Sequence, residues 1–216
     1  CVSYWLAPTE NFSGDIVAAA RSPAGDLSIL LGDATGHGLG AAICTLPVLS
    51  VFYGMCDWGI DLPKIVREVN RQLQAALPIG HFVAACMLRL GADGRHADAW
   101  IAGTPDLLVL GQGGQVRHRL ASANLPLGVD GGGEKSFRFE RIALDPGDQL
   151  VLCSDGVVDA ENPQGQAFGH DRLCEVLASA DAGSRLEALK LALAQHLDGA
   201  APHDDISVML IDARPA

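Results

Sequence analysis

The stretch Leu27–Gly40, LSILLGDATGHGLG, decides the fold that we expect for this chain. Its first five residues form an apolar run, which is typical of a buried strand. The run ends at Gly32-Asp33, a glycine-rich turn follows, and a long apolar segment begins at Leu39. Glycines in such a turn allow unusual backbone angles and the close approach of a ligand. The pattern therefore places an acidic side chain, Asp33, at a strand end, where a divalent cation could bind it.

The same stretch supports two other interpretations. Gly36, Gly38 and Ala41 have the spacing of a dinucleotide-binding fingerprint between a strand and a helix. However, Asp33 would repel a pyrophosphate, and the acidic residue expected about 20 residues later at a second strand end is missing; Asp57 follows an apolar helix instead. We therefore discount a nucleotide-dependent oxidoreductase. The remaining alternative is a glycine turn with a solvated aspartate, whereas a metal site predicts further carboxylates at other strand ends.

Composition and length limit the class of protein. The chain has 216 residues, of which 49% are hydrophobic and 19% charged, so we expect a single globular domain over residues 1–216. Its net charge of -11 argues against nucleic acid or an anionic membrane as a partner. Because the chain starts with Cys1 rather than Met, we expect it to be the C-terminal part of a longer regulatory protein.

The cysteines and one apolar segment bear on localisation. None of the six cysteines forms a CxxC pair, so we expect free thiols in a reducing cytoplasm and no zinc site. A signal peptide is not recognisable, which fits a cytoplasmic location. The uncharged segment from Leu39 to Cys56 is long enough to raise the question of a membrane span. Thr45, Pro47 and Ser50 interrupt it, and we expect a buried core helix there.

The order of the expected elements indicates an α+β antiparallel sandwich. A strand from Gly14 to Arg21 and the turn 22–26 precede the Leu27 strand, so antiparallel pairing would bring Asp15 and Asp33 to the same end of a hairpin. Runs of strands then alternate with pairs of helices, which favours a sandwich covered by helices. The further expected helices are 39–54, 61–77, 171–180 and 184–197, and the further strands are 81–90, 96–102, 106–110, 116–120, 137–144, 149–154 and 206–211.

Carboxylates lie beside strand ends four times, at Asp15, Asp33, Asp155 and the pair Asp204-Asp205. Each one alone is an ordinary turn residue. If these carboxylates met in one cleft about 5 Å apart, the repulsion within each close pair would destabilise the folded chain by about 3 kcal/mol at an effective dielectric constant of about 20. Cations bound between them would offset this repulsion. Oxygen ligands favour Mg²⁺ or Mn²⁺. Two such ions can activate a water and clamp a phosphate, so that no covalent nucleophile is required.

These residues also carry a resemblance to a known family. The segment Gly32–Ala42, GDATGHGLGAA, resembles the GD-(V/A)-(S/T)-GHG-xxAA segment of bacterial metal-dependent protein phosphatases, the SpoIIE/RsbU-type branch of the protein phosphatase 2C (PPM) family. The segment 13–15 resembles the family's first Gly-Gly-Asp motif, and 125–129 resembles a family loop. Likewise, 154–160 is similar to SDGVTEA and 204–208 to the closing DDITL. The matches cover nearly the whole chain in the family's order.

The resemblance implies a four-layer α/β/β/α sandwich of two antiparallel sheets flanked by pairs of helices. It implies hydrolysis of phosphoserine or phosphothreonine on a protein, with two Mn²⁺ or Mg²⁺ ions. The implied partners are a small anti-anti-sigma (STAS-type) substrate and an upstream sensor or receiver domain. Asp33 matches the metal-bridging residue and Ala34 supplies a carbonyl ligand. The other implied ligands are Asp155, Asp204 and, often through water, Asp15.

The role of His37 and two differences from the family's motifs leave alternative interpretations open. His37 could act as an acid or base beside the metals, or it could simply pack in the turn. After the first motif, residues 16–19 replace the family's aromatics and second aspartate. Thr104 stands where the family's AGHPP motif has histidine. Neither departure removes a proposed metal ligand. Both allow an alternative function, a catalytically silent adaptor with a phosphatase fold that binds a regulator.

Overall fold

The computed structural model describes residues 1–36, 38–78, 80–129 and 137–214, and within them two five-stranded sheets pack face to face. The first sheet contains β1 (Val2–Ala7), β6 (Leu107–Leu110), β7 (Val116–Leu120), β9 (Gln149–Cys153) and β10 (Ile206–Asp212). The second contains β2 (Asp15–Arg21), β3 (Leu27–Ala34), β4 (Val83–Leu90), β5 (His96–Ala102) and β8 (Glu140–Ala143). The helices are α1 (Gly38–Asp57), α2 (Leu62–Ala76), α3 (Asp155–Val158), α4 (His170–Ser179) and α5 (Arg185–Leu197).

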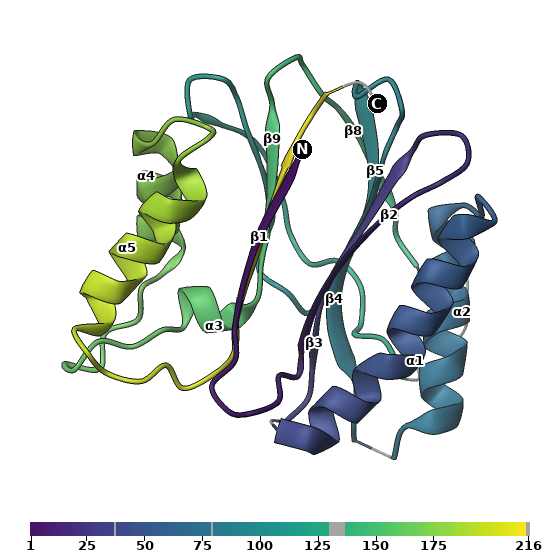
Figure 1. The fold of residues 1–216 in the computed structure, drawn as a ribbon, viewed down its shortest axis with the longest axis horizontal. Coiled ribbons are helices and arrows are strands. Elements are labelled where there is room, and N and C mark those ends of the chain that lie inside the picture. The colour runs from purple at the N-terminus through teal and green to yellow at the C-terminus, as the bar shows by residue number, and fades with distance from the viewer. Residues whose placement is uncertain (37, 79, 130–136, 215–216) are drawn as a thin grey trace.

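The elements form four layers (Figure 1). The strand orders are β1-β10-β9-β6-β7 and β2-β3-β4-β5-β8, and neighbouring named strands pair antiparallel throughout the described chain. Helices α1 and α2 cover the outer face of the second sheet, and α4 and α5 cover that of the first. The expected α+β, four-layer α/β/β/α sandwich is confirmed. An antiparallel arrangement also excludes the doubly wound parallel sheet of a dinucleotide-binding protein.

Strand β3 shows why the sequence folds this way. Its apolar side chains alternate between the two faces of the sheet, as strand geometry requires. Ile29 and Leu31 lie in the core between the sheets, whereas Leu30 lies in the core under α1 and α2. All three are fully buried. A strand covered on both faces is therefore a continuous apolar run, and such a strand holds the residues at its end in fixed positions.

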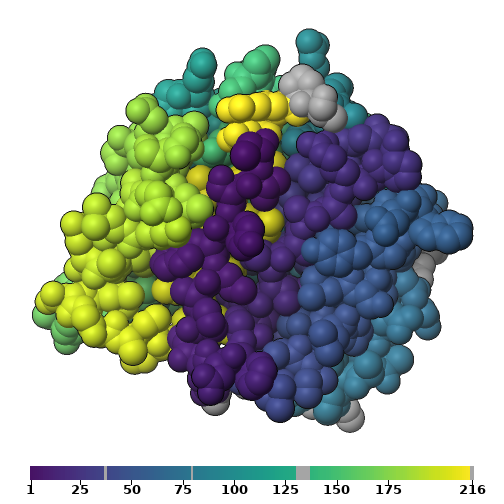
Figure 2. All heavy atoms as spheres, viewed as in Figure 1, coloured from purple at the N-terminus to yellow at the C-terminus, as the bar shows by residue number. Residues whose placement is uncertain are grey.

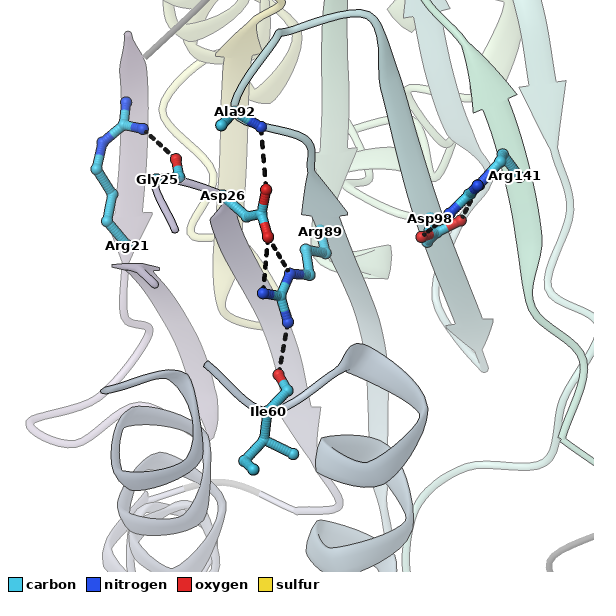
Figure 3. A network of polar contacts seen from close by, with 8 residues as sticks. All are labelled: Arg21, Gly25, Asp26, Ile60, Arg89, Ala92, Asp98 and Arg141. Carbon is cyan, nitrogen blue, oxygen red and sulfur yellow. Dashed lines mark hydrogen bonds and ion pairs between the residues drawn. The ribbon is translucent and has the colours of Figure 1, made fainter. Parts of the chain in front are cut away.

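A polar network fixes the opposite end of the second sheet (Figure 3). Asp26, in the turn between β2 and β3, accepts hydrogen bonds from Arg89 Nε and Nη2 at 3.0 and 2.7 Å. Its other oxygen accepts from the backbone N–H of Ala92 at 3.1 Å. Arg89 also donates to the carbonyl of Ile60 at 2.6 Å, just before α2. One ion pair thus ties two hairpin turns to the connection between α1 and α2.

Some boundaries differ from the sequence-based expectation. The N-terminal residues carry no clear pattern, yet Val2–Ala7 forms β1, an edge strand paired with β10. Pairing decides this strand, since its side chains are only half-buried or exposed. The expected strand at 137–144 is shorter, from Glu140 to Ala143. Asp61 caps the start of α2, because its Oδ1 accepts a hydrogen bond from the N–H of Lys64 at 3.0 Å.

Helix α1 departs from the expected buried core helix. By length and composition alone, this helix could cross a membrane. Only 28% of its most apolar stretch is buried inside the protein. Its inner side packs on α2 and β2. That side comprises Gly38, Ala41, Thr45, Val48, Phe52 and Cys56. The outer side is exposed, so the expectation is right for one face of the helix and wrong for the other.

All six cysteines are free. Cys56, Cys86 and Cys153 are buried, whereas Cys44 and Cys174 are only partly buried. The expectation of free thiols is therefore confirmed. Burial raises the pKa of Cys153 to about 12, with the nearby charge of Asp155 adding to the effect. This thiol stays protonated and serves as a small apolar side chain in the core.

Candidate active site

The β2–β3 hairpin brings the first two predicted carboxylates together. Asp15 and Asp33 are directly opposite each other in the ladder, as expected from the hairpin. Asp33 also pairs across to Ala84 of β4, so it sits in the interior of the sheet. The next residue, Ala34, donates its N–H to the carbonyl of Gly14 at 3.2 Å. The register therefore fixes both acidic residues at one end of the second sheet.

The first sheet supplies the remaining carboxylates from two neighbouring strands. Asp155 is the first residue of α3, directly after β9, and Asp204 precedes β10. Ser154 ties the two segments together, because its N–H donates to the carbonyl of Ser207 at 2.9 Å. Gly156 permits the close contact, since a Cβ there would overlap the carbonyl oxygen of Asp205. Two distant segments of sequence therefore present carboxylates at the same edge.

These residues meet at an open cleft of about 430 Å³. Asp33, Asp155 and Asp204 line it, one from each of three segments, and Ala34 lines it beside Asp33. The remaining walls are Thr35, Gly36, Phe82, Ala84, Gly103 and Pro126. Asp15 is not part of the lining and is only 4% exposed, adjacent to Asp33 in the ladder. His37 lies outside the described residues.

Burial and repulsion oppose ionisation of Asp15. Burial is the main reason that its pKa rises to about 7. The hydroxyls of Ser207 and Ser154 offset part of this rise, while the charges of Asp205 and Asp204 add to it. In the absence of a cation, this carboxyl therefore retains a proton near neutral pH on part of the molecules.

Asp33 is affected in the same way. Burial, followed by the charges of Asp15 and Asp155, raises its pKa to about 8. Burial and the charge of Asp204 also raise the pKa of Asp155. A positive charge among such carboxylates stabilises their charged form, and a divalent cation supplies it.

Asp205 has a different role from its neighbour Asp204. Its Oδ1 accepts hydrogen bonds from Thr9 N and Oγ1 at 2.7 and 2.8 Å. Its Oδ2 accepts from Ser13 Oγ and Gly14 N at 2.7 and 2.9 Å. Burial acts to raise the pKa of Asp205, but these hydrogen bonds outweigh it and hold the pKa below its usual value. Asp205 therefore fastens β10 to the segment before β2, while Asp204 lines the cleft.

The donor set fits a hard divalent cation. Asp15 Oδ2 and Asp155 Oδ1 are buried, and neither has a hydrogen-bond partner among the described residues. The predicted ligands offer only carboxylate and carbonyl oxygens, which Mg²⁺ and Mn²⁺ prefer. Among the described residues, no three acidic, histidine or cysteine side chains already form a closed metal cage. A cation would therefore be held by carboxylates that converge on it from the walls of the cleft.

Several lining residues were not predicted as part of the site. Gly103 has a φ of +79°, and a Cβ there would press on Ala84 and Pro126. Both Gly103 and Pro126 lie in segments that the resemblance had matched, so a signal existed for them. Phe82 carries no such signal. It reaches the cleft because its carbonyl accepts a hydrogen bond from Thr35 N at 3.0 Å, a contact between residues far apart in sequence.

The sequence of the chain matches a known family along most of its length. The model of the family described as Stage II sporulation protein E (SpoIIE) matches residues 23–214. Protein IcfG of Synechocystis sp. is 27% identical over 238 residues, covering 94% of this chain and 36% of that protein. Phosphoserine phosphatase RsbP of Bacillus subtilis is 25% identical over 161 residues, covering 73% of this chain and 39% of that protein. The chain thus spans less than half the length of these relatives.

Solved structures show the same fold. The SiaA-PP2C domain of Pseudomonas aeruginosa superposes with a TM-score of 0.83 at 22% identity, covering 98% of this chain and 84% of that one. The PP2C phosphatase domain of SpoIIE from Bacillus subtilis, solved with a fragment of its regulatory domain, gives 0.79 at 18% identity, covering 98% and 62%. The RsbU and RsbW domains of Rv1364c from Mycobacterium tuberculosis give 0.80 at 18% identity, covering 100% and 60%.

Proposed function

This chain belongs to the SpoIIE family, and we propose that it is a metal-dependent protein phosphatase that hydrolyses phosphoserine or phosphothreonine on a regulatory partner. The observation that carries the proposal is the convergence of Asp33, Asp155 and Asp204 on one open cleft. The cleft, with a volume of about 430 Å³, is large enough to admit a phosphorylated side chain. The name of RsbP, a phosphoserine phosphatase, supports the same type of substrate.

Each residue of the site has a proposed task. Asp33, the Ala34 carbonyl, Asp155 and Asp204 would hold two Mn²⁺ or Mg²⁺ ions, and Asp15, opposite Asp33 in the ladder, would contribute through water. When bound, the metals supply an activated water and neutralise charge on the phosphate. Asp33 would help to hold the metals and to orient that water. His37 is proposed to exchange a proton with water or the leaving group.

The small residues that line the cleft also have a proposed role. Gly36 and Gly103 leave room beside the carboxylates, and their backbone angles favour glycine, with φ of +89° and +79°. A phosphoserine can therefore approach the acidic side chains without meeting a bulky neighbour. Phe82 and Pro126 limit the cleft on its other sides. A phosphorylated side chain that fills the cleft would displace water from it, and this strengthens the electrostatic interactions with the phosphate.

The partners and the location are part of the proposal. We propose a small anti-anti-sigma (STAS-type) phosphoprotein as the substrate and an upstream sensor or receiver domain as the regulator, in the cytoplasm. RsbU and RsbW domains occur together in the Mycobacterium tuberculosis structure that shares this fold, which supports a phosphatase acting in a partner-switching system. The silent-adaptor alternative is not favoured, because every proposed carboxylate ligand is retained at the edge of the sheets.

Phosphate release from synthetic phosphopeptides tests the activity. We expect hydrolysis of phosphoserine and phosphothreonine peptides with Mn²⁺, little hydrolysis of phosphotyrosine, and none with chelator. Asp155→Asn should lose turnover by at least about 100-fold, because a ligand to the activating metal is lost. Glu187→Gln, a surface change on α5, is the matched control and should keep full activity. Equal turnover in Asp155→Asn and wild type would overturn the proposal.

A further inference from the structure

A second hollow, of about 490 Å³, opens beside the active-site cleft. It lies between the C-terminal end of α2, the segment that leads into β4 and the loop 126–129, and we call it the side pocket. No Asp, Glu, Lys or Arg is among the described residues that line it. An uncharged hollow with apolar walls and a few polar groups is typical of sites that bind a ligand. The side chains on its wall are those of Leu77, Pro78, Phe82, Val129, Gln74 and His81.

The side pocket shares a wall with the cleft. Phe82 lines both of them. The loop 126–129 also borders both, since Pro126 lines the cleft and Gly128 lines the side pocket. A ligand seated in the cleft therefore has the side pocket as its immediate neighbour, with one aromatic residue and one loop between the two.

Hydrogen bonds fix this shared wall. The N–H of Phe82 donates to Thr35 Oγ1 at 3.1 Å, and its carbonyl accepts from the N–H of Thr35 at 3.0 Å. Leu127 and Val83 exchange two backbone hydrogen bonds, at 2.8 and 2.9 Å. The N–H of Gly128 donates to Asn70 Oδ1 on α2 at 2.9 Å. The side pocket is thus formed before a ligand arrives, so little ordering of the protein opposes binding.

The other flank of the cleft has a different character. On the side of α3, a hollow of about 440 Å³ shares Asp204 with the cleft. Its walls include two further carboxylates, Asp159 and Glu161. An apolar side chain placed there would take water away from charged groups without pairing them, which is unfavourable. The cleft therefore has an uncharged flank toward α2 and an acidic flank toward α3, and a substrate segment that crosses it meets two unlike surfaces.

The cleft and the side pocket belong to the same end of the sandwich. Ala34, the last residue of β3, pairs with Val83, the first residue of β4. Figure 2 shows the N-terminal segment, in purple, between the helices of the two outer layers. This segment fills the space between the layers on the face drawn there, so we expect a substrate segment to approach at the end of β3 and to cross the cleft and the side pocket together.

Strand geometry sets which side chain of the substrate can enter the side pocket. In an extended segment, side chains two residues apart point to the same side and are about 7 Å apart. We propose that the side pocket is a specificity site that accepts an uncharged apolar side chain, the size of leucine, two residues from the phosphoserine of the substrate protein. The assignment rests on the proposed phosphatase function, in which the phosphoserine occupies the cleft.

Binding of phosphonate peptides tests the proposal, because a methylene in place of the ester oxygen of phosphoserine prevents hydrolysis. One peptide carries leucine two residues before the phosphonate, one carries it two residues after, and one has alanine at both positions. Fluorescence anisotropy with Mn²⁺ should show one leucine peptide binding about tenfold more tightly than the alanine peptide. The other leucine peptide should gain nothing, because the side pocket lies on only one flank of the cleft.

A variant that fills the side pocket tests its position. Val129→Phe adds bulk to the wall and should reduce the ratio of the two affinities to about one. The matched control is Val116→Phe, which makes the same change at a 40% exposed valine on β7 and should keep the tenfold ratio. Circular dichroism verifies that each variant is folded, and the comparison of peptides on the wild type does not depend on either variant.

The outcomes separate the side pocket from the phosphatase activity. The proposal is overturned by equal binding of the three peptides, by a gain at both positions, by no binding at all, or by a leucine preference that survives Val129→Phe. Hydrolysis of an aryl phosphate, which is too small to reach the side pocket, reports on the activity alone. A leucine preference without such hydrolysis supports the side pocket and contradicts the phosphatase function, whereas hydrolysis without the preference overturns only the side pocket.

Discussion

Asp15 lies directly opposite Asp33 in the antiparallel pairing of β2 with β3; Asp15 is buried, and Asp33 is partly buried where it lines the cleft. Two acidic residues at such a position destabilise the folded chain whenever both are charged. Strand β3, which carries Asp33, and its neighbour β4 are deeply buried and hold the pair in place. The arrangement therefore stores an unfavourable interaction that a cation at the cleft would relieve.

The first prediction concerns the metal-free protein. Burial raises the pKa of Asp33 to about 8, so between about pH 4 and 8 the folded state binds more protons than the unfolded state. Stability contributed by this group is therefore lost as the pH rises through that window. Asp33→Asn should stabilise the metal-free protein at pH 8 by about 1–2 kcal/mol and have little effect near pH 4. Urea unfolding in chelator at both pH values measures this, and a destabilised variant at pH 8 would contradict it.

The second prediction concerns metal binding. Because Asp15 and Asp33 hold protons near neutral pH, a cation must displace them. Binding of Mn²⁺ should release protons and should weaken as the pH falls from about 8 to about 6. Calorimetry in two buffers with different ionisation enthalpies measures the number of protons released. Unchanged affinity and no proton release across this range would show that the metal does not displace protons from these carboxyls.

The third prediction separates two adjacent acidic residues. Asp205→Asn turns one carboxylate oxygen into a donor that faces other donors, Ser13 and Gly14 or Thr9. It should lower the free energy of unfolding by about 2–3 kcal/mol. Asp204→Asn should change stability by less than about 0.5 kcal/mol while abolishing turnover. Denaturant unfolding and phosphate release on both variants check this, and the reverse pattern would contradict the assignment.

The fourth prediction tests the contact between α3 and β10. A methyl group at Gly156 would overlap the carbonyl oxygen of Asp205, so Gly156→Ala must push the two segments apart. We expect a loss of stability of about 1–3 kcal/mol, together with weaker Mn²⁺ binding, because Asp155 moves with the helix. Gly183→Ala is the control, since nothing lies within 4 Å of its Cβ. Thermal unfolding and metal titration of both variants give the comparison.

Much of the site could be predicted because local sequence patterns indicated the strands and turns that hold it. The apolar run before Asp33 indicated a buried strand, and the turn at 22–26 indicated a hairpin, so the meeting of Asp15 with Asp33 followed from pairing geometry. The carboxylates at 155 and 204 were marked by their positions beside apolar strands. That these three segments share one cleft required the order of strands across both sheets, which local patterns do not encode.

Other features depended on tertiary contacts. Strand β1 has no alternating pattern, and it forms because β10 offers a free edge. The distinct roles of Asp204 and Asp205 are invisible in sequence, since they depend on donors from Thr9 and Ser13, at the other end of the chain. The long and largely apolar α1 suggested complete burial, but a helix lying on a sheet buries only one side. These are cases in which tertiary packing overrides local preference.

The most direct test of the phosphatase proposal is hydrolysis of an aryl phosphate ester by wild type, Asp33→Asn and Asp171→Asn, each with Mn²⁺ and with chelator. Asp171 is exposed on α4, which covers the other sheet, and serves as the matched control. We predict turnover in the wild type and in Asp171→Asn that requires Mn²⁺, and a loss of at least about 100-fold in Asp33→Asn. Turnover that persists in chelator, or that survives Asp33→Asn, would contradict the central claim that these carboxylates form a metal-dependent phosphatase site.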